Sequence, residues 1–349
     1  MIKPSSFKLD KKQGQYYKAI DIIKEKEYQL SRAQEDILEK MEVLYRSLCV
    51  VLYNYVPLSG HPGGSISSGP IALNLVYNVM AYDLAKPYEP GFDILSYAAG
   101  HKALGLYALS AIRNEIGTPY FNPKRQYALR LEDLLGFRKA PTTNTKYFKD
   151  CNSKSLDGHP VPSTPFVCLA TGASGVGFGA SVGLALGAAI NYKEKAPKVH
   201  ILEGEGGLTA GRVAEALAIA SRAGLDNLII HLDWNQASID SDKVCAQNGQ
   251  AGDYVAWQPK ELFYINGLNV IEVEDGSDFK QIYGAQKFAN TLNNGVPTAI
   301  VYKTIKGRKY GIEGRKSHGS GHKFASEGYY KALEEFEKTF GVQIPRFEG

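Results

Sequence analysis

Hydrophobic and polar residues alternate with a helical period near the start of the chain. Apolar side chains recur at helical spacing among many charged ones, and neither Gly nor Pro interrupts the run before Pro57. The pattern predicts one long amphipathic helix from Tyr17 to about Tyr55. We interpret residues 1–56 as an N-terminal helical arm that covers either a core or a partner surface.

Beyond the arm, short apolar runs alternate with helical stretches. Strands are predicted at Asp93–Tyr97, Phe166–Ala170, Val199–Leu202, Asn227–Leu232, Asn269–Val273 and Thr298–Tyr302. Helices are predicted at Gly69–Tyr82, Ala103–Ile116, Val176–Ile190, Thr209–Ala223 and Asp278–Leu292. The alternation predicts an α/β domain over residues 57–349, with a mostly parallel sheet and helices on both faces. Ligands of such sheets bind at the carboxyl ends of the strands.

The segment around residues 113–165 breaks this alternation. It is rich in Pro, Asn, Thr and Lys, and its pattern indicates one helix, at Leu129–Lys139. A long irregular stretch inside a compact domain is usually functional or mobile. We therefore interpret it as an irregular insertion.

Composition narrows the class of protein. The chain has 349 residues, a net charge of +4, 44% hydrophobic and 22% charged residues, which excludes collagen-like and disordered classes. No apolar run is long enough for a membrane span, and the polar N-terminus does not resemble a signal peptide. Scattered basic residues give no sign of a nucleic-acid partner. Four widely spaced cysteines favour a reducing cytoplasm over a disulfide framework or a zinc site.

Histidines beside glycines are the first chemical signal. Five of the seven histidines are next to a glycine in the sequence: His61, His101, His159, His318 and His322. Glycine permits tight turns and a close approach of a ligand to the backbone. Imidazole donates to phosphates and moves protons near neutral pH. A surface-loop role is the alternative for any single one.

A glycine-rich segment from Thr171 to Ala180 leads into a predicted helix. Free amides and the helix dipole at such a start favour an anionic group such as a diphosphate. Gly175-x-Gly177-x-x-Ala180 also approximates a dinucleotide fingerprint, in which Glu203 would bind the ribose. A nicotinamide-dependent dehydrogenase and close packing of a small-residue helix are therefore open alternatives at this point.

Two neighbouring predicted strands end in oxygen-bearing side chains. Gly204-Glu205-Gly206 follows one strand, and Asp233-Trp234-Asn235 closes the next. One helix separates Glu205 from Asn235, so adjacent parallel strands would bring both to the same edge of the sheet. A carboxylate, an amide oxygen and a backbone carbonyl are ligands of Mg²⁺ or Ca²⁺. This pair favours a metal-bound diphosphate over a dinucleotide.

Together these motifs resemble the thiamine-diphosphate (ThDP) enzymes and, within them, the transketolase family. The resemblance runs from about Ser59 to His322. It rests on the ordered series Ser59-Gly60-His61-Pro62-Gly63-Gly64, Ala99-Gly100-His101, Leu131-Glu132-Asp133-Leu134, Gly158-His159-Pro160, Thr171-Gly172-Ala173-Ser174-Gly175-Val176-Gly177, Gly204-Glu205-Gly206 through Asn235, and Ser317-His318-Gly319.

The resemblance implies a role for each matching residue. The metal, Mg²⁺ with Ca²⁺ left open, would be held by Glu205, Asn235 and the Ala237 carbonyl. Thiamine diphosphate would be contacted by His101, Gly172, Ser174, Gly206, Asn235 and His318. Catalytic hydrogen bonding and proton transfer would fall to His61, His101, His159 and His318.

The chain also departs from the family pattern. Glu205 stands where Asp is usual, and Ala210 replaces a glutamate of the family's paired-acid relay, which leaves Glu215 as the other member. The segment Thr209-Ala210-Gly211 is more similar to deoxyxylulose-phosphate synthase than to transketolase. The family's pyrimidine-binding and C-terminal domains do not follow before Gly349.

We therefore expect the diphosphate-binding subunit of a split transketolase, inactive alone. It would assemble as α₂β₂ with a separate pyrimidine-binding subunit and act on sugar phosphates. A 2-oxo acid dehydrogenase E1 α-like subunit, a deoxyxylulose-phosphate-synthase-like subunit and a non-catalytic ThDP-binding scaffold are the alternatives.

Overall fold

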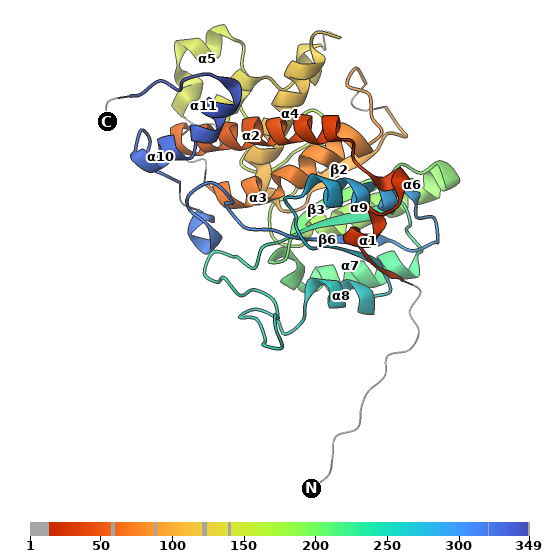
Figure 1. Ribbon diagram of the computed structural model, residues 1–349. Helices are drawn as coiled ribbons and strands as arrows, with labels where there is room; N and C mark the ends of the chain where they lie inside the picture. The colour runs from red at the N-terminus through yellow and green to blue at the C-terminus, as the bar shows by residue number, and fades with distance from the viewer. Residues whose placement is uncertain are drawn as a thin grey trace.

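Six parallel strands form the centre of the molecule. The computed structural model describes residues 14–56, 60–86, 89–120, 124–138, 141–319 and 321–347. The strands lie in the order β1-β5-β6-β4-β3-β2, and every neighbouring pair is parallel (Figure 1). Their bounds are β1 Tyr16–Lys18, β2 Ile94–Tyr97, β3 Val199–Gly204, β4 Leu228–Trp234, β5 Asn269–Val273 and β6 Thr298–Lys303.

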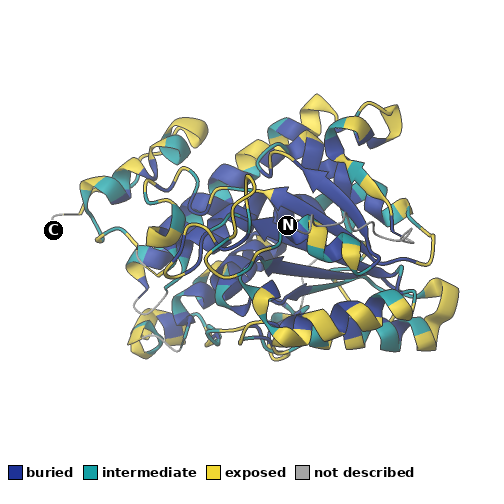
Figure 2. Ribbon diagram, turned by 90° about the horizontal axis from the view of Figure 1, so that it is seen from below, coloured by how far each residue is buried: buried dark blue, intermediate teal, exposed yellow. Residues whose placement is uncertain are grey.

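Helices cover both faces of the sheet, which confirms the predicted fold class. On one face lie α3 (Pro62–Asn74) and α9 (Phe279–Thr291), with α2 (Arg32–Tyr55) and α4 (Ala103–Gly117) packed outside them. On the other face lie α6 (Val176–Tyr192), α7 (Gly211–Arg222) and α8 (Pro259–Ile265). Figure 2 shows the strands buried between these layers and the outer helices exposed on one side. Residues of alternating direction along each strand supply two hydrophobic cores.

Shorter elements connect these layers. The remaining α-helices are α1 (Ala19–Ile22), α5 (Lys146–Asp150), α10 (Glu327–Lys331) and α11 (Glu334–Phe340). A π-helical turn, η2 (Leu75–Val79), extends α3. The 3-10 turns are η1 Lys26–Tyr28, η3 Gly100–Lys102, η4 Arg125–Tyr127, η5 Leu131–Gly136, η6 Pro141–Asn144, η7 Lys193–Lys195, η8 Gly207–Thr209 and η9 Gly314–Ser317. No helix in the described ranges is both long enough and apolar enough to cross a bilayer.

The single helix predicted from Tyr17 to Tyr55 is wrong. The segment begins as strand β1, continues as α1 and η1, and becomes a long helix only at α2. A capping box starts α2: the Ser31 hydroxyl accepts from the Gln34 amide, and the Gln34 side chain accepts from the Ser31 amide. The Ser-x-x-Gln spacing is visible in the sequence and marks this helix start. Strand β1 forms because its backbone pairs with β5, and β1 is thereby the edge strand of the sheet.

Three further predicted elements differ in the structure. Phe166–Ala170 is not a strand, because Phe166 has a left-handed backbone with φ 66° and prolines before it remove amide donors. The helix predicted at Leu129–Lys139 shrinks to the turn η5, and Lys139 lies outside the described residues. The helix predicted to begin at Gly69 begins earlier, at Pro62. Ser59, the first residue of the first histidine motif, also lies outside the described residues.

The remaining two histidines form a buried hydrogen-bonded chain inside the sheet. His200 on β3 and His231 on β4 are fully buried, and their ring nitrogens Nδ1 and Nε2 are 3.0 Å apart. The other nitrogen of His231 lies 2.9 Å from the hydroxyl of Tyr302 on β6. Burial holds the pKa of His231 well below its ordinary value, so the ring stays neutral at pH 7. These two rings are therefore part of the core.

Glu272 on β5 links neighbouring elements at the edge of the sheet through ion pairs and a hydrogen bond. Its buried carboxylate accepts from Lys303 at 2.8 Å, from Lys260 at 3.1 Å and from the Tyr16 hydroxyl of β1. Burial would raise the pKa of Glu272, but these partners outweigh it and lower the pKa to about 2. Because the folded-state pKa is the lower one, the ionised carboxylate stabilises the fold above about pH 4.5, and this contribution is lost as the pH falls towards 2.

A Glu272→Gln variant is expected to lower the free energy of unfolding at pH 7 by about 1–3 kcal/mol. The difference from wild type should shrink as the pH is lowered from 4.5 towards 2, measured by urea unfolding across that range. Glu274→Gln, which removes an exposed carboxylate near the same strand, is the control and should change stability by less than about 0.5 kcal/mol. A constant difference at all pH values would contradict the ionic role of Glu272.

Candidate functional site

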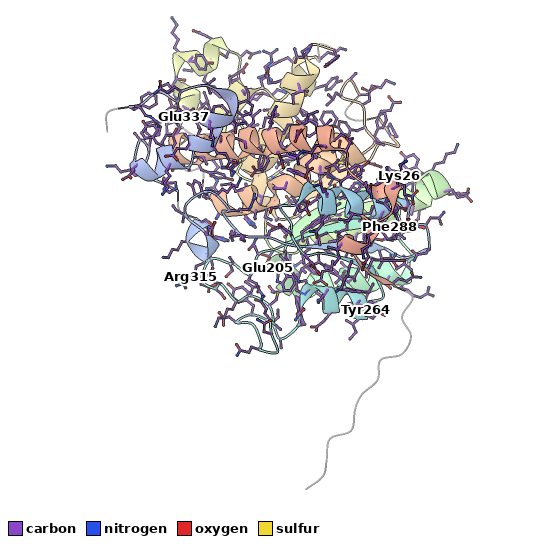
Figure 3. The ribbon with its side chains drawn as sticks, in the orientation of Figure 1. Lys26, Glu205, Tyr264, Phe288, Arg315 and Glu337 are labelled. Carbon is purple, nitrogen blue, oxygen red and sulfur yellow. The ribbon has the colours of Figure 1, made fainter. Side chains whose placement is uncertain are left out.

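The predicted metal ligands follow two neighbouring strands. Glu205 comes directly after β3 and Asn235 directly after β4, and the strands pair with Gly204 opposite Asp233. The amide of Asn235 donates to Oε2 of Glu205 at 3.3 Å. Figure 3 shows Glu205 near the middle of the molecule, between Arg315 on one side and Tyr264 on the other. The structure therefore brings Glu205 and Asn235 together, as their spacing predicts.

Glu205 is a buried acid with unused hydrogen-bonding capacity. Its side chain is 2% exposed, and within the described ranges Oε1 has no hydrogen-bond partner. Burial, together with the nearby Asp233 carboxylate, raises the pKa of Glu205 to about 7. A buried oxygen of this kind is suited to a cation, because a bound ion removes the desolvation cost of the carboxylate.

Asn235 and Ala237 present the other two predicted oxygens. Asn235 Oδ1 accepts from the Ala237 amide at 3.1 Å, which fixes the side chain over the turn. The Ala237 carbonyl accepts from Lys306 Nζ at 2.8 Å. Burial lowers the pKa of Lys306 to about 8, although Glu205 opposes this shift. An ammonium group thus already lies beside the oxygens expected to bind a cation, and it balances part of their charge.

A buried ion pair that the sequence did not reveal orients Asn235. Lys102 Nζ lies 2.7 Å from Oδ2 of Asp233, and both side chains are almost fully buried. The same oxygen accepts from the Ser67 hydroxyl at 2.7 Å and from Asn235 Nδ2 at 3.2 Å. Burial alone would raise the pKa of Asp233, but Lys102 and the hydrogen bonds hold it below its ordinary value. Since Nδ2 is held by Asp233, Oδ1 of Asn235 is directed away from it.

Three of the predicted histidines form a cluster. The ring centroids of His61, His101 and His318 are 5.0–5.7 Å apart, although the residues come from the start of α3, from η3 and from the end of η9. His61 Nδ1 donates to the His318 carbonyl at 2.6 Å, and Lys306 Nζ donates to His318 Nδ1 at 2.8 Å. These bonds fix the proton positions and leave Nε2 of His61 as an acceptor and that of His318 as a donor.

Burial keeps these imidazoles neutral. It is the main cause that lowers the pKa of His61, places that of His101 well below its ordinary value, and lowers that of His318 to about 4. Lys102 and Lys306 add to the shifts of His101 and His318, respectively. A neutral ring offers one hydrogen-bond donor and one acceptor at pH 7, whereas charged rings would repel one another.

His159 and the glycine-rich segment meet at the edge of this cluster. A Cβ on Gly100 would lie 3.0 Å from the ring of His159 and 2.8 Å from the backbone of Gly172. His159 is exposed, and its carbonyl accepts from the Tyr107 hydroxyl at 3.0 Å. Only glycine at position 100 permits this close approach of three segments.

The start of α6 has the expected open geometry. Gly175 caps the helix with φ 77°, and Ser174 before it is exposed. A Cβ on Gly175 would lie 2.8 Å from Cβ of Ala210. Ala210, which stands where the resemblance predicts a relay glutamate, therefore packs against this turn. A Cβ on Gly206 would meet nothing within 4 Å, which leaves its backbone approachable. Glu215 on α7 is exposed.

Glu203 does not have the position of a ribose-binding acid. It is 2% exposed, its Oε1 accepts from the Gly204 amide at 2.9 Å, and a Cβ on Gly207 would lie 2.4 Å from its carboxyl carbon. The side chain therefore lies beneath the turn that follows β3. Burial raises the pKa of Glu203 to about 7. This placement is against the dinucleotide alternative.

The donor set as a whole fits a hard divalent cation beside a diphosphate. The free Oε1 of Glu205 is the observation that supports the fit. No group of three or more His, Cys, Asp or Glu side chains in the described ranges could hold a metal. The predicted ligands are instead one carboxylate, one amide oxygen and one backbone carbonyl. Sequence reasoning missed Lys102, Asp233 and Lys306, because charged residues give no signal of burial until the chain is folded.

A parallel sheet whose adjacent strands end in this donor set, with histidines converging beside it, defines a class of α/β domains that bind a diphosphate cofactor. The family model "Transketolase, thiamine diphosphate binding domain" matches residues 124–343. Human transketolase is 35% identical over 264 residues, which cover 75% of this chain and 36% of that protein. Transketolase-like protein 2 of Bos taurus is 34% identical over 254 residues, covering 72% of this chain and 34% of that protein.

Solved structures agree with this match. Transketolase from Campylobacter jejuni superimposes with a TM-score of 0.66 at 27% identity and covers 85% of this chain and 42% of that one. Transketolase from Leishmania mexicana gives 0.65 at 25% identity and covers 86% of this chain and 41% of that one. The chain belongs to the transketolase family as a thiamine-diphosphate-binding domain. It spans a little over a third of the length of the curated relatives it matches.

Proposed function

We propose that this chain is the diphosphate-binding subunit of a split transketolase. It transfers a two-carbon ketol unit between sugar phosphates once a separate pyrimidine-binding subunit has assembled with it as α₂β₂. The convergence of His61, His101 and His318 beside Glu205 and Asn235 carries the proposal. A site that only anchored a cofactor would need the oxygen ligands but not three neutral imidazoles.

Each part of the site has a distinct task in this proposal. Glu205, Asn235 and the Ala237 carbonyl hold Mg²⁺, which fixes the diphosphate, and the Gly206 amide and His101 contact that group. The bound thiamine diphosphate supplies the carbon nucleophile that carries the ketol unit. His61 accepts hydrogen bonds through Nε2 and His318 donates through its own, so together they orient hydroxyl and carbonyl groups of a sugar.

The backbone of Gly172 and Ser174 faces the aminopyrimidine in this arrangement. His159, at the exposed edge of the cluster, contacts the sugar as it enters. The partner subunit supplies the acid that activates the cofactor, which has no counterpart among the site residues described above. Four free thiols in the chain support work in a reducing compartment, the cytoplasm.

The test is ketol transfer from xylulose 5-phosphate to ribose 5-phosphate, with ThDP and Mg²⁺ supplied. This chain is assayed alone and mixed with a pyrimidine-domain chain from the same genome. We expect turnover only in the mixture, where each component alone stays at background, and co-elution of the two chains on gel filtration. Activity of this chain alone would contradict the split arrangement.

Two other outcomes overturn parts of the proposal. A mixture that binds ThDP tightly but transfers no ketol unit would assign another ThDP reaction, such as that of a 2-oxo acid dehydrogenase or deoxyxylulose-phosphate synthase. If the two chains assembled but did not bind ThDP, this chain would be a non-catalytic scaffold. Cofactor binding is therefore measured in the same samples as turnover.

A further inference from the structure

The segment that follows α11 is held against α10 and α11 by polar contacts. Glu337 on α11 accepts from the Ile344 amide at 2.8 Å and from Arg346 Nη2 at 2.9 and 3.0 Å. The Arg346 guanidinium also lies 4.3 Å from the ring centroid of Tyr330, and the Tyr330 hydroxyl accepts from the Phe347 amide at 2.7 Å. Because of these contacts, the segment has a fixed course although it contains no helix or strand.

This fixed course brings three aromatic rings from distant parts of the chain together. The ring centroid of Phe324 lies 5.4 Å from that of Phe347 and 5.7 Å from that of Tyr55, at the carboxyl end of α2. Tyr55 is 51% exposed and Phe347 is 52% exposed, whereas Phe324, which neighbours both, is half-buried. We name these three residues the aromatic patch. Single exposed apolar residues are common on protein surfaces, but neighbouring exposed rings are typical of a surface that binds a partner.

The aromatic patch lies at the same side of the molecule as the histidine cluster. Tyr55 ends α2, and the next helix along the chain, α3, begins directly after His61. Figure 3 shows Glu337 of α11 on the same side as Arg315 of η9, the turn that directly precedes His318. A partner that covers the aromatic patch would therefore border the site.

Exposed apolar side chains also flank the predicted metal ligands. Ile239, two positions after Ala237, is 70% exposed, and Ile305, next to Lys306, is 53% exposed. Lys306 Nζ donates to the Ala237 carbonyl at 2.8 Å, so the two isoleucines lie on segments that meet at the site. Large exposed apolar side chains are the usual anchors of protein interfaces, because a partner that covers them removes them from water.

The proposed reaction needs a second subunit at this end of the sheet. That subunit supplies the acid that activates the cofactor, and the predicted ligands Glu205 and Asn235 follow the carboxyl ends of β3 and β4. Tyr120, which is 87% exposed, lies instead beyond the end of α4, a helix that starts beside His101 and returns towards the amino end of the sheet. A partner bound at Tyr120 would not reach the cofactor, whereas a partner bound at the aromatic patch would.

We propose that the aromatic patch binds the pyrimidine-binding subunit, through an apolar face of that subunit. The inference takes its partner from the proposed function and therefore rests on it. Burial of Tyr55 and Phe347 in the complex removes two large rings from water, which favours assembly. Because the aromatic patch adjoins the segment that carries His61, the same contact closes one side of the site.

The test measures the Kd between this full chain and the pyrimidine-domain chain from the same genome, by calorimetry with ThDP and Mg²⁺ present. Tyr55→Ala and Phe347→Ala should each raise this Kd at least about tenfold. Tyr120→Ala, which removes an exposed ring away from the site, is the matched control and should change it less than about twofold. Each variant alone should melt close to wild type, because these rings are exposed in the free chain. A large excess of the partner should restore turnover of both patch variants, which distinguishes a docking residue from a residue of the site.

The outcomes separate this docking surface from the proposed function. If the wild-type chains assemble and transfer the ketol unit but both patch variants bind as tightly as Tyr120→Ala, the aromatic patch is not the docking surface and the split arrangement stands. If the wild-type chains do not assemble, the proposed function fails and the docking surface fails with it. If the patch variants instead change the self-association of this chain alone, measured by sedimentation, the aromatic patch binds a second copy and the proposal is overturned.

Discussion

An Asn235→Ala variant is expected to lose Mg²⁺-dependent ThDP binding in the assembled enzyme. Asn235 joins the two halves of the donor set: its amide bonds Glu205 and its Oδ1 accepts from the Ala237 amide. The substitution removes one of the oxygens proposed to bind the metal, and it removes the hydrogen bond from the Ala237 amide that holds the turn. We expect ThDP affinity at saturating Mg²⁺ to fall by at least about 100-fold, since even outer partners of a metal site contribute 10–100-fold.

The measurement is a calorimetric ThDP titration, repeated after chelation of the metal. Wild type should lose its affinity on chelation, whereas Asn235→Ala should be weak with or without metal. Asn191→Ala is the matched control, because that exposed asparagine bonds only the Gly187 carbonyl among the contacts described. Unchanged affinity in a folded Asn235→Ala protein would remove this residue from the metal site.

Lys102→Met is expected to be the most destabilising of these substitutions. The variant would leave the Asp233 carboxylate fully buried without its cation, and breaking such a pair from one side typically lowers the free energy of unfolding by about 3–5 kcal/mol. Because Asp233 also holds Asn235 Nδ2, we expect weaker ThDP binding as well.

Chemical unfolding of the variant and of two controls tests this expectation. The double variant Lys102→Met/Asp233→Leu removes both charges and should recover most of the lost stability. Lys24→Met breaks an exposed ion pair with Asp21, 2.6 Å long, and should change stability by less than about 1 kcal/mol. If Lys102→Met were no more destabilising than Lys24→Met, the buried pair would not stabilise the fold.

The site differs from the expected family pattern at Glu205, which stands where aspartate is usual. Glu205 reaches the edge of the sheet with one more methylene than aspartate would have, and its free Oε1 remains buried rather than solvated. Lys306 lies between the Ala237 carbonyl and His318 and so connects the expected metal ligands to the histidine cluster. One ammonium group therefore contacts both the Ala237 carbonyl and the ring of His318.

Periodicity in the sequence determined most of the sheet and helix layers. Strands such as Val199–Gly204 are continuous apolar runs because both faces of a parallel sheet are buried, and this signal is local. The wrong predictions arose where the apolar pattern and another determinant of structure disagreed. Ser31 and Gln34 begin a new helix inside a run whose apolar period continues across the break, and Phe166–Ala170 is apolar without a neighbouring strand to pair with.

Local sequence patterns were enough to predict which residues follow the strands. They therefore also predicted that Glu205 and Asn235 meet, because adjacent parallel strands bring the residues at their carboxyl ends together. Which charges are buried could not be predicted from local patterns. Lys102 and Asp233 are 131 positions apart, and Arg113 looks like any helical surface cation until Phe166 covers it. Whether a charged side chain is buried depends on the residues that surround it in space, and those residues come from distant parts of the chain.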